Sequence, residues 1–259
     1  MYLLPYRASA EGYWVRSGRP SLNPDPDPAW LPGWGVPVWR DEFDGGLSQW
    51  NVRNNFITFD TARAMASKVA IVDGQLRVRA NWLATPEATG PQGIITHETG
   101  YIDTRNLVDS ANPNPKRFSQ QYGRWEVRCK TPSGPNTRGS LAAFWLRCDN
   151  HPGEIDIMEV LSKDAQVTHT TQHSSIGGHK IDGEANYTPE TDDGMHTYGL
   201  LWGKDELVWF VDNVEVFRSD TPADMHQPMF LLANLALGGW GGGIDKTALP
   251  AEFQIDYIR

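Results

Sequence analysis

The stretch GEIDIMEV, residues 153–160, combines a strand-like pattern with three acidic residues. Glu154 and Asp156 alternate with isoleucines, which predicts a β-strand with its acids on one face. The third acid, Glu159, comes one residue later than a period of two requires, with Met158 in its place. A β-bulge at Met158 would return Glu159 to the acidic face, whereas a regular strand would bury it in the core at high cost. The pattern therefore predicts a bulged strand with three carboxylates on one surface.

Three crowded carboxylates repel one another, so at least one of them should have a raised pKa. A protonated carboxyl group beside an ionised one is the pair that glycoside hydrolysis requires. Two other interpretations fit the octet as well: an exposed acidic strand edge, and a calcium site, because hard cations prefer oxygen ligands. The octet alone leaves all three open.

Short strand-like runs separated by turn signals recur on both sides of the octet. The dipeptides Asp73-Gly74 and Asp212-Asn213 each separate two such runs and predict hairpins. The run 122–130 places one set of residues, including Trp125, on one face and Arg124 on the other. No convincing amphipathic helix or repeat is evident. The pattern predicts an all-β fold, an antiparallel sandwich or jelly roll.

Two regions differ in composition. Residues 1–37 are rich in Pro and Gly, and we expect an irregular N-terminal arm or linker there. Residues 38–259 carry the strand-like runs, and their length suits a single domain.

The two cysteines, Cys129 and Cys148, could form a disulfide or be two small buried side chains, and their segments are expected to pair as neighbouring strands. Most of the 11 tryptophans should be core, and some could line a groove for sugar rings.

The charge and hydropathy patterns exclude several classes of partner. The formal net charge is −9 and no Lys/Arg cluster is present, which argues against nucleic acid and anionic membranes. No apolar run is long enough to span a bilayer. The start, MYLLPYR, lacks the apolar core of a signal peptide, so the protein is intracellular or its signal is absent from this sequence.

The octet and its neighbours resemble glycoside hydrolase family 16, in the bulged form typical of its β-1,3-glucanases, the laminarinases. Eight further segments resemble family strands in the same order: WRDEFDG (39–45), QYGRWEVRCKTP (121–132), LAAFWL (141–146), THTTQH (168–173), HTYGLLW (196–202), VWFVDN (208–213), FLLANLALGG (230–239) and IDYIR (255–259). The resemblance implies a concanavalin A-like β-jelly-roll sandwich of two antiparallel sheets with a concave glycan-binding cleft. It also implies Glu154 as nucleophile, Glu159 as general acid/base and Asp156 as the residue that tunes their protonation.

The resemblance further implies substrate-binding residues. Trp145 should stack on a sugar, because alternation places its neighbours in the core, and His173 should reach the catalytic groups unless it is structural. Trp240 forms a cleft wall or covers the sandwich. Asn234 and Arg124 are weaker candidates for polar contacts with the glycan.

The family often carries a calcium ion away from the catalytic groups. The matching residues are Glu42 and Asp256, with a backbone carbonyl from Gly74. The alternative is that both acids simply tie the terminal strands together. No cofactor is expected in the chemistry itself.

Some segments depart from the family pattern and bear on the substrate. Ser140-Leu141-Ala142 replaces a common Trp-Pro, and NVRNNFITFDTARAM (51–65) replaces a Trp/Gly-rich segment. Loops of this kind set specificity. We expect a secreted, monomeric, retaining endo-glycanase acting on a polysaccharide, β-1,3-glucan or mixed-linkage β-glucan. The alternatives are a galactan hydrolase, a transglycosylase and a non-catalytic, lectin-like binding module.

Overall fold

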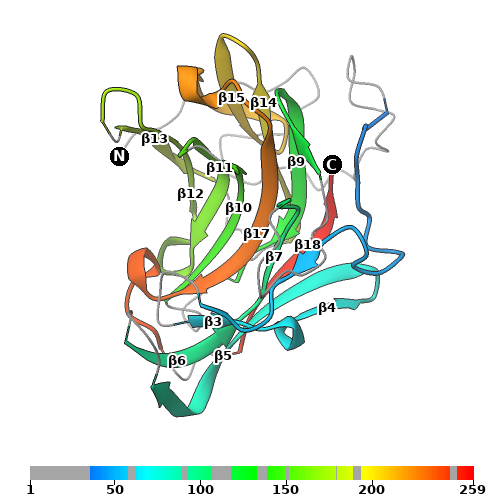
Figure 1. The fold of residues 1–259 in the computed structure, drawn as a ribbon, viewed down its shortest axis with the longest axis vertical. Helices are drawn as coiled ribbons and strands as arrows, with labels where there is room; N and C mark the ends of the chain where they lie inside the picture. Colours follow the sequence, from blue (N-terminus) through cyan, green and yellow to red (C-terminus); the bar gives the residue numbers. More distant parts are fainter. Residues whose placement is uncertain are drawn as a thin grey trace.

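The computed structural model describes residues 36–57, 62–88, 93–106, 118–132, 139–149, 152–178, 180–188, 194–245 and 250–259. These residues form two β-sheets that pack face to face (Figure 1). The sandwich predicted from the sequence is confirmed. Nearly all of the expected N-terminal arm, residues 1–35, lies outside the described part. No helix in the described ranges has the length and hydropathy of a membrane span.

The first sheet carries the acidic octet and has the strand order β1-β7-β17-β10-β11-β12-β13, with β8 beside β17. Its strands are β1 (Asn51–Val52), β7 (Tyr101–Asp103), β8 (Ser119–Gln120), β10 (Ser140–Cys148), β11 (Glu154–Leu161), β12 (Val167–Ser174), β13 (Lys180–Tyr187) and β17 (Met229–Leu237).

The second sheet has the order β16-β15-β14-β9-β18-β5-β6-β3-β2, with β4 beside β5. Its strands are β2 (Phe56–Ile57), β3 (Ala62–Ala64), β4 (Val69–Val72), β5 (Gln75–Ala88), β6 (Ile94–Thr99), β9 (Gly123–Lys130), β14 (His196–Trp202), β15 (Glu206–Val211), β16 (Val214–Asp220) and β18 (Ala251–Ile258). Short 3₁₀ turns are η2 (Ala66–Lys68), η3 (Ser162–Asp164), η4 (Ala223–Met225) and η5 (Gly239–Gly241). The pairings are antiparallel, as expected, except that β3 and β6 run parallel.

The two predicted hairpins are present. Asp73 and Gly74 have φ angles of 53° and 70°, and Asp212 and Asn213 have 47° and 63°. Positive φ at both central residues is typical of type I′ turns, whose twist matches that of the strands they join. The first turn joins β4 to β5 and the second joins β15 to β16.

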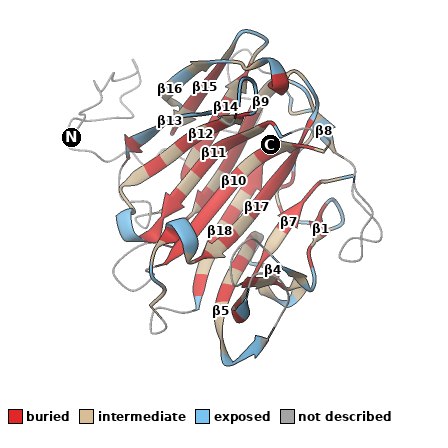
Figure 2. Ribbon diagram, turned by 60° about the vertical axis from the view of Figure 1, so that its left-hand side comes forward, coloured by how far each residue is buried: buried red, intermediate tan, exposed pale blue. Residues whose placement is uncertain are grey.

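The core lies between the sheets, where the inward side chains of both are buried (Figure 2). Trp125 and Val127 of β9 belong to one buried cluster with Phe144 and Leu146 of β10. Between Phe144 and Leu146, Trp145 points away from the core and is only partly buried. Neighbouring residues of β10 therefore serve either the core or the outer face of the sheet.

The expectation for the cysteines was wrong in part. Cys129 and Cys148 are free and buried, which agrees with two small core side chains rather than a disulfide. Their strands, β9 and β10, belong to different sheets and do not pair. Adjacency in sequence therefore does not become adjacency in a sheet.

Candidate active site

Strand β11 contains the predicted bulge. Trp145 of β10 pairs with Asp156 and Phe144 pairs with Met158, so the register shifts by one residue between them. On the other side, the pairing with β12 shifts between Asp156 and Glu159. Met158 lies at the bulge and is fully buried in the core. Burial of the extra apolar residue on the core side explains why Glu159 returns to the face that carries Glu154 and Asp156.

The registers align three rows of side chains across this face, which we call the acid-bearing face. The row of Glu154 contains Phe230, Arg147, Glu154, His173 and Ile181. The row of Asp156 contains Asp103, Leu232, Trp145, Asp156, Thr171 and Gly183. The row of Glu159 contains Tyr101, Asn234, Ala143, Glu159, His169 and Ala185.

Glu154 lies between two basic side chains. Arg147 Nε is 3.9 Å from Glu154 Oε2, and His173 is the partner of Glu154 on β12. Burial, followed by the charge of Asp156, raises the pKa of Glu154 to about 7, while His173 and Arg147 act in the opposite direction. The basic neighbours therefore limit the rise and favour the ionised form.

Among the residues that the structure describes, no basic side chain lowers the pKa of Glu159 in the way that His173 and Arg147 lower that of Glu154. Burial is the main cause that raises its pKa to about 9, and the charges of Asp156 and Glu154 add to the rise. Its partner on β12 is His169, whose ring centroid lies 4.7 Å from that of Trp240. Burial lowers the pKa of His169, which favours the neutral ring. Glu159 is therefore the more readily protonated of the two glutamates.

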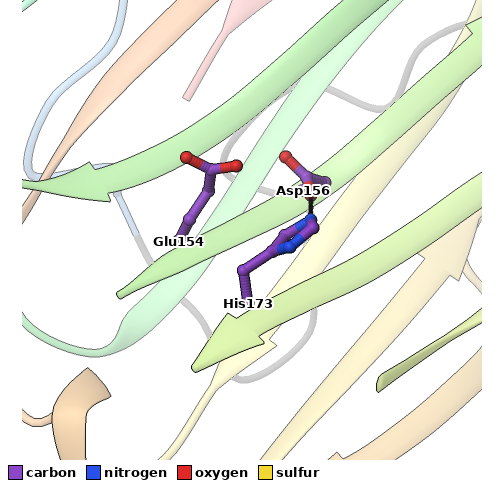
Figure 3. Close-up of side chains that lie close together, drawn as sticks. All are labelled: Glu154, Asp156 and His173. Carbon is purple, nitrogen blue, oxygen red and sulfur yellow. Dashed lines mark ion pairs between the residues drawn. The ribbon is translucent and has the colours of Figure 1, made fainter. Parts of the chain in front are cut away.

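The row of Asp156 lies between those of the two glutamates. Asp156 contacts His173 (Figure 3). His173 Nε2 lies 3.1 Å from Asp156 Oδ2, and this hydrogen bond is the main reason that the pKa of His173 is raised. Burial raises the pKa of Asp156, and the bond to His173 opposes that rise. The backbone carbonyl of Asp156 accepts a hydrogen bond of 2.9 Å from Trp209 Nε1, which fixes the strand to the opposite sheet.

A pocket of about 290 Å³ opens on the acid-bearing face beside these groups. Trp145 lines it, and its Nε1 donates a hydrogen bond of 2.8 Å to Asn234 Oδ1, which fixes the indole ring. Arg53 and Asp103 lie deeper and form a buried ion pair with an Nη2–Oδ1 distance of 3.0 Å. The lining thus combines flat aromatic surface with polar groups, as carbohydrate recognition requires.

The structure brings together most of the predicted site residues. Trp145, Asn234 and His173 lie on the acid-bearing face, and the half-exposed Trp240 packs on His169, the neighbour of Glu159. Contact of these side chains with a sugar stays a prediction.

The expectation for Arg124 was wrong in position. Arg124 lies on β9 of the second sheet, on the face turned away from the core, where it binds Glu126 Oε2 at 2.8 Å and Asn213 Oδ1 at 2.9 Å. Its guanidinium also lies over the ring of Phe210. The alternation of β9 buries Trp125 and turns Arg124 outward, so Arg124 does not reach the acids of the first sheet.

The residues proposed for calcium do not fit a cation site. Both oxygens of Glu42 accept hydrogen bonds of 2.9 Å from Arg259, and Asp256 Oδ2 accepts one of 2.8 Å from Arg128. A guanidinium beside each carboxylate replaces the cation that these acids would need. The contacts of Glu42 with Arg259 and of Asp256 with Arg128 agree with the alternative, in which the acids tie the terminal strands.

Glu154, Asp156 and His173 offer three ligand atoms within 4.8 Å of one another, and they are the one such group among the described residues. The guanidinium of Arg147 beside Glu154 and the bond between His173 and Asp156 make a cation unfavourable there. These contacts fit an acid–base network better than a metal centre.

Three residues of this face were missed in the sequence. Arg147 follows Trp145 by two positions, so the alternation that placed Trp145 outward could have placed Arg147 there too. His169 precedes His173 by four positions and shares its face for the same reason. Tyr101 comes from a distant segment, and only the pairing of β7 with β17 brings it beside Asn234.

Comparisons with known proteins identify the family of this chain. Residues 102–259 match the sequence profile of Glycosyl hydrolases family 16. The endo-1,3-1,4-β-glycanase ExsH of Rhizobium meliloti (strain 1021) is 31% identical over 217 residues, which are 83% of this chain and 43% of that protein. The chain thus spans less than half the length of this relative.

Solved structures of two related proteins share the fold. The catalytic domain of an endo-1,3-β-glucanase (laminarinase) from Thermotoga petrophila RKU-1 superposes with a TM-score of 0.72 at 25% identity, over 86% of this chain and 95% of that one. An endo-acting O-glycanase from the human gut microbiota superposes with a TM-score of 0.74 at 26% identity, over 88% of this chain and 91% of that one. With the profile covering more than half of its residues, the chain belongs to glycosyl hydrolase family 16.

Proposed function

We propose that this chain is a retaining endo-β-glucanase that cleaves β-1,3-glucan or mixed-linkage β-1,3-1,4-glucan. The observation that carries the proposal is the unequal surroundings of the two glutamates. Basic side chains flank Glu154, whereas carboxylates are the charged groups that act on Glu159. One group is therefore poised to attack as a carboxylate while the other is poised to donate a proton.

The first step forms a covalent intermediate. A carboxylate oxygen of Glu154 bonds to the anomeric carbon as the bond from that carbon to the glycosidic oxygen breaks. Glu159 gives its proton to the departing oxygen. Asp156 lies between them, bound to His173, and its negative charge keeps the proton on Glu159 until the leaving oxygen takes it.

The second step releases the sugar. Glu159, now ionised, takes a proton from water, whose oxygen bonds to the anomeric carbon and displaces Glu154 as a carboxylate. The β-configuration is retained because the carbon is inverted twice. Two carboxyl groups carry both steps, so the chemistry requires no cofactor.

Two observations support glucan as the substrate. Trp145, held by Asn234, offers a flat apolar surface beside the catalytic row, and sugar rings stack on such surfaces. The relatives named above include an endo-1,3-1,4-β-glycanase and an endo-1,3-β-glucanase. Trp240, half exposed beside His169, would form the wall of the cleft next to Glu159.

We propose a monomer as the active unit, because Glu154, Asp156 and Glu159 all lie on the same strand, β11. A polymeric glucan does not cross a membrane, so we place the reaction outside the cell.

The release of reducing ends from laminarin, lichenan and agarose tests the proposal. We expect cleavage of laminarin or lichenan, with proton NMR of the first product showing the β-anomer. Glu154→Gln should abolish the release. Cleavage of agarose alone would replace glucan by galactan, and α-anomer as the first product would replace the retaining mechanism by an inverting one. Binding without cleavage by the unaltered protein would assign a non-catalytic, lectin-like role.

A further inference from the structure

We propose that Arg147 is a positioning residue for the reaction, holding the side chain of Glu154 as an ionised carboxylate before the attack and again when it leaves. This inference rests on the proposed function. It is carried by the row in which Arg147 of β10, Glu154 of β11 and His173 of β12 are consecutive neighbours.

The partners of the pocket arginines differ. Arg53 is paired with the buried Asp103, and Arg105 Nε donates a hydrogen bond of 2.9 Å to Asp149 Oδ1. Arg147 also lines the pocket, and its acidic neighbour is Glu154, at 3.9 Å. Of these three arginines, Arg147 is the one whose ion pair involves the nucleophile.

The two basic neighbours of Glu154 act differently. A guanidinium stays charged at every pH at which the enzyme works, whereas an imidazole does not. His173 also directs Nε2 to Asp156, so its charge is shared with a second acid. Arg147 therefore supplies the positive charge that does not depend on pH.

The other groups that face Glu154 work against ionisation or are neutral. Asp156 raises the pKa of Glu154, whereas Glu159, with a pKa of about 9, keeps its proton over the range in which Glu154 ionises and is neutral there. Tyr101 of β7 stays neutral, because burial raises the pKa of its hydroxyl further. Without Arg147, the ionised form would depend on the protonation of His173.

The charge also matters after the attack. In the intermediate Glu154 is a neutral ester, and Arg147 loses its carboxylate partner. When water attacks, the carbon–oxygen bond to Glu154 breaks and the carboxylate forms again beside the guanidinium. Removal of Arg147 should therefore slow the breakdown of the intermediate.

The pH dependence of kcat/KM for Arg147→Met, Arg147→Lys and Arg105→Met tests the role. Because Arg147 is 41% exposed, we expect Arg147→Met to move the acidic limb upward by only about 0.5–1 pH unit. Arg147→Lys should keep the limb near its original pH. Arg105→Met, which alters an arginine paired elsewhere, should leave the limb in place even if KM changes. If the acidic limb of the kcat/KM profile lies at the same pH in all variants as in the unaltered enzyme, the proposal is overturned.

A second measurement does not depend on activity. Carbon-13 NMR of protein labelled at the glutamate carboxyl carbons follows the titration of Glu154, whose signal is the one lost in Glu154→Gln. We expect the midpoint to rise in Arg147→Met and to recover in Arg147→Lys. An unchanged midpoint would overturn the role of Arg147 even if the protein cuts glucan. A raised midpoint in a protein that cuts no polymer would sink the proposed function alone.

Discussion

Strands β9 and β11 both alternate charged and apolar residues, but the acids on and beside them lie in opposite surroundings. On the outer face of β9, Arg124 lies 2.8 Å from Glu126, and Arg128 lies 2.8 Å from Asp256 of β18. On β11, the three acids crowd one face, where His173 contacts Asp156 and the more distant Arg147 lies beside Glu154. The charges that act on Glu159 are those of the other two acids. An acid with its own arginine stabilises the sandwich, whereas an acid crowded by other acids keeps a proton that it can give away.

The largest effect should come from the loss of the crowded acids. Glu154→Gln and Glu159→Gln should each lower kcat for glucan cleavage about 10²–10⁴-fold, because one removes the nucleophile and the other the proton donor. Glu252→Gln, which alters an acid of β18 paired with Arg77 and Arg79, is the matched control and should stay within a factor of a few. Initial rates of reducing-end release measure all three. Comparable losses in the control would erase the distinction between crowded acids and acids paired with arginine.

The pH dependence of the unaltered enzyme should reflect the same crowding. The rate should rise as pH increases through the pKa of Glu154, about 7, since the nucleophile must be ionised. It should fall as pH increases through the pKa of Glu159, about 9, since the donor must keep its proton. A profile of kcat/KM against pH should thus be bell-shaped, with both limbs above the range of exposed glutamates. A maximum below pH 5 would show that burial and the neighbouring carboxylates do not raise the pKa values of Glu154 and Glu159.

Much of this contrast could be predicted from the sequence, because it depends on alternation within a strand. The late position of Glu159 was enough to predict the bulge, and the neighbours of Trp145 were enough to turn it outward. The errors concern relations between strands. The sequence predicts contact of Arg124 with the glycan, but the alternation within its strand shows only that Arg124 and Trp125 lie on opposite faces of that strand. Which sheet a strand joins depends on long-range pairing, and no local pattern records it.

The same limit explains the calcium expectation. The pairing of Glu42 with Arg259 joins the two ends of the domain, and that of Asp256 with Arg128 joins β18 to β9. An arginine partner far away in sequence cannot be found by inspecting the acid and its neighbours. Acids whose partners lie far away in sequence can therefore be mistaken for ligands of an ion.

Stability should change in opposite directions at a crowded acid and at an acid paired with arginine. The pKa of Glu159 is raised from 4.5 to about 9, so the folded protein loses stability as pH rises from about 5 through 9, where the unfolded chain is ionised more readily. Glu159→Gln should therefore raise Tm at pH 9 by about 2–6 °C and change it little at pH 4. Glu252→Gln should leave Tm equal or lower by about 2 °C. Thermal unfolding at the two pH values decides, and a lower Tm for Glu159→Gln at pH 9 would contradict the burial argument.

The smallest expected effect is a change in glycan binding, which should occur on the acid-bearing face and not on the outer face of β9. Trp145→Phe removes part of the flat ring and the hydrogen bond to Asn234, so KM for oligosaccharides should rise about threefold to tenfold. Arg124→Met keeps an unbranched side chain on the outer face of β9 and should change KM by less than about twofold. Titration calorimetry in a Glu154→Gln background measures the same difference without turnover. A comparable loss of affinity in Arg124→Met would mean that glycan also binds the outer face of the second sheet.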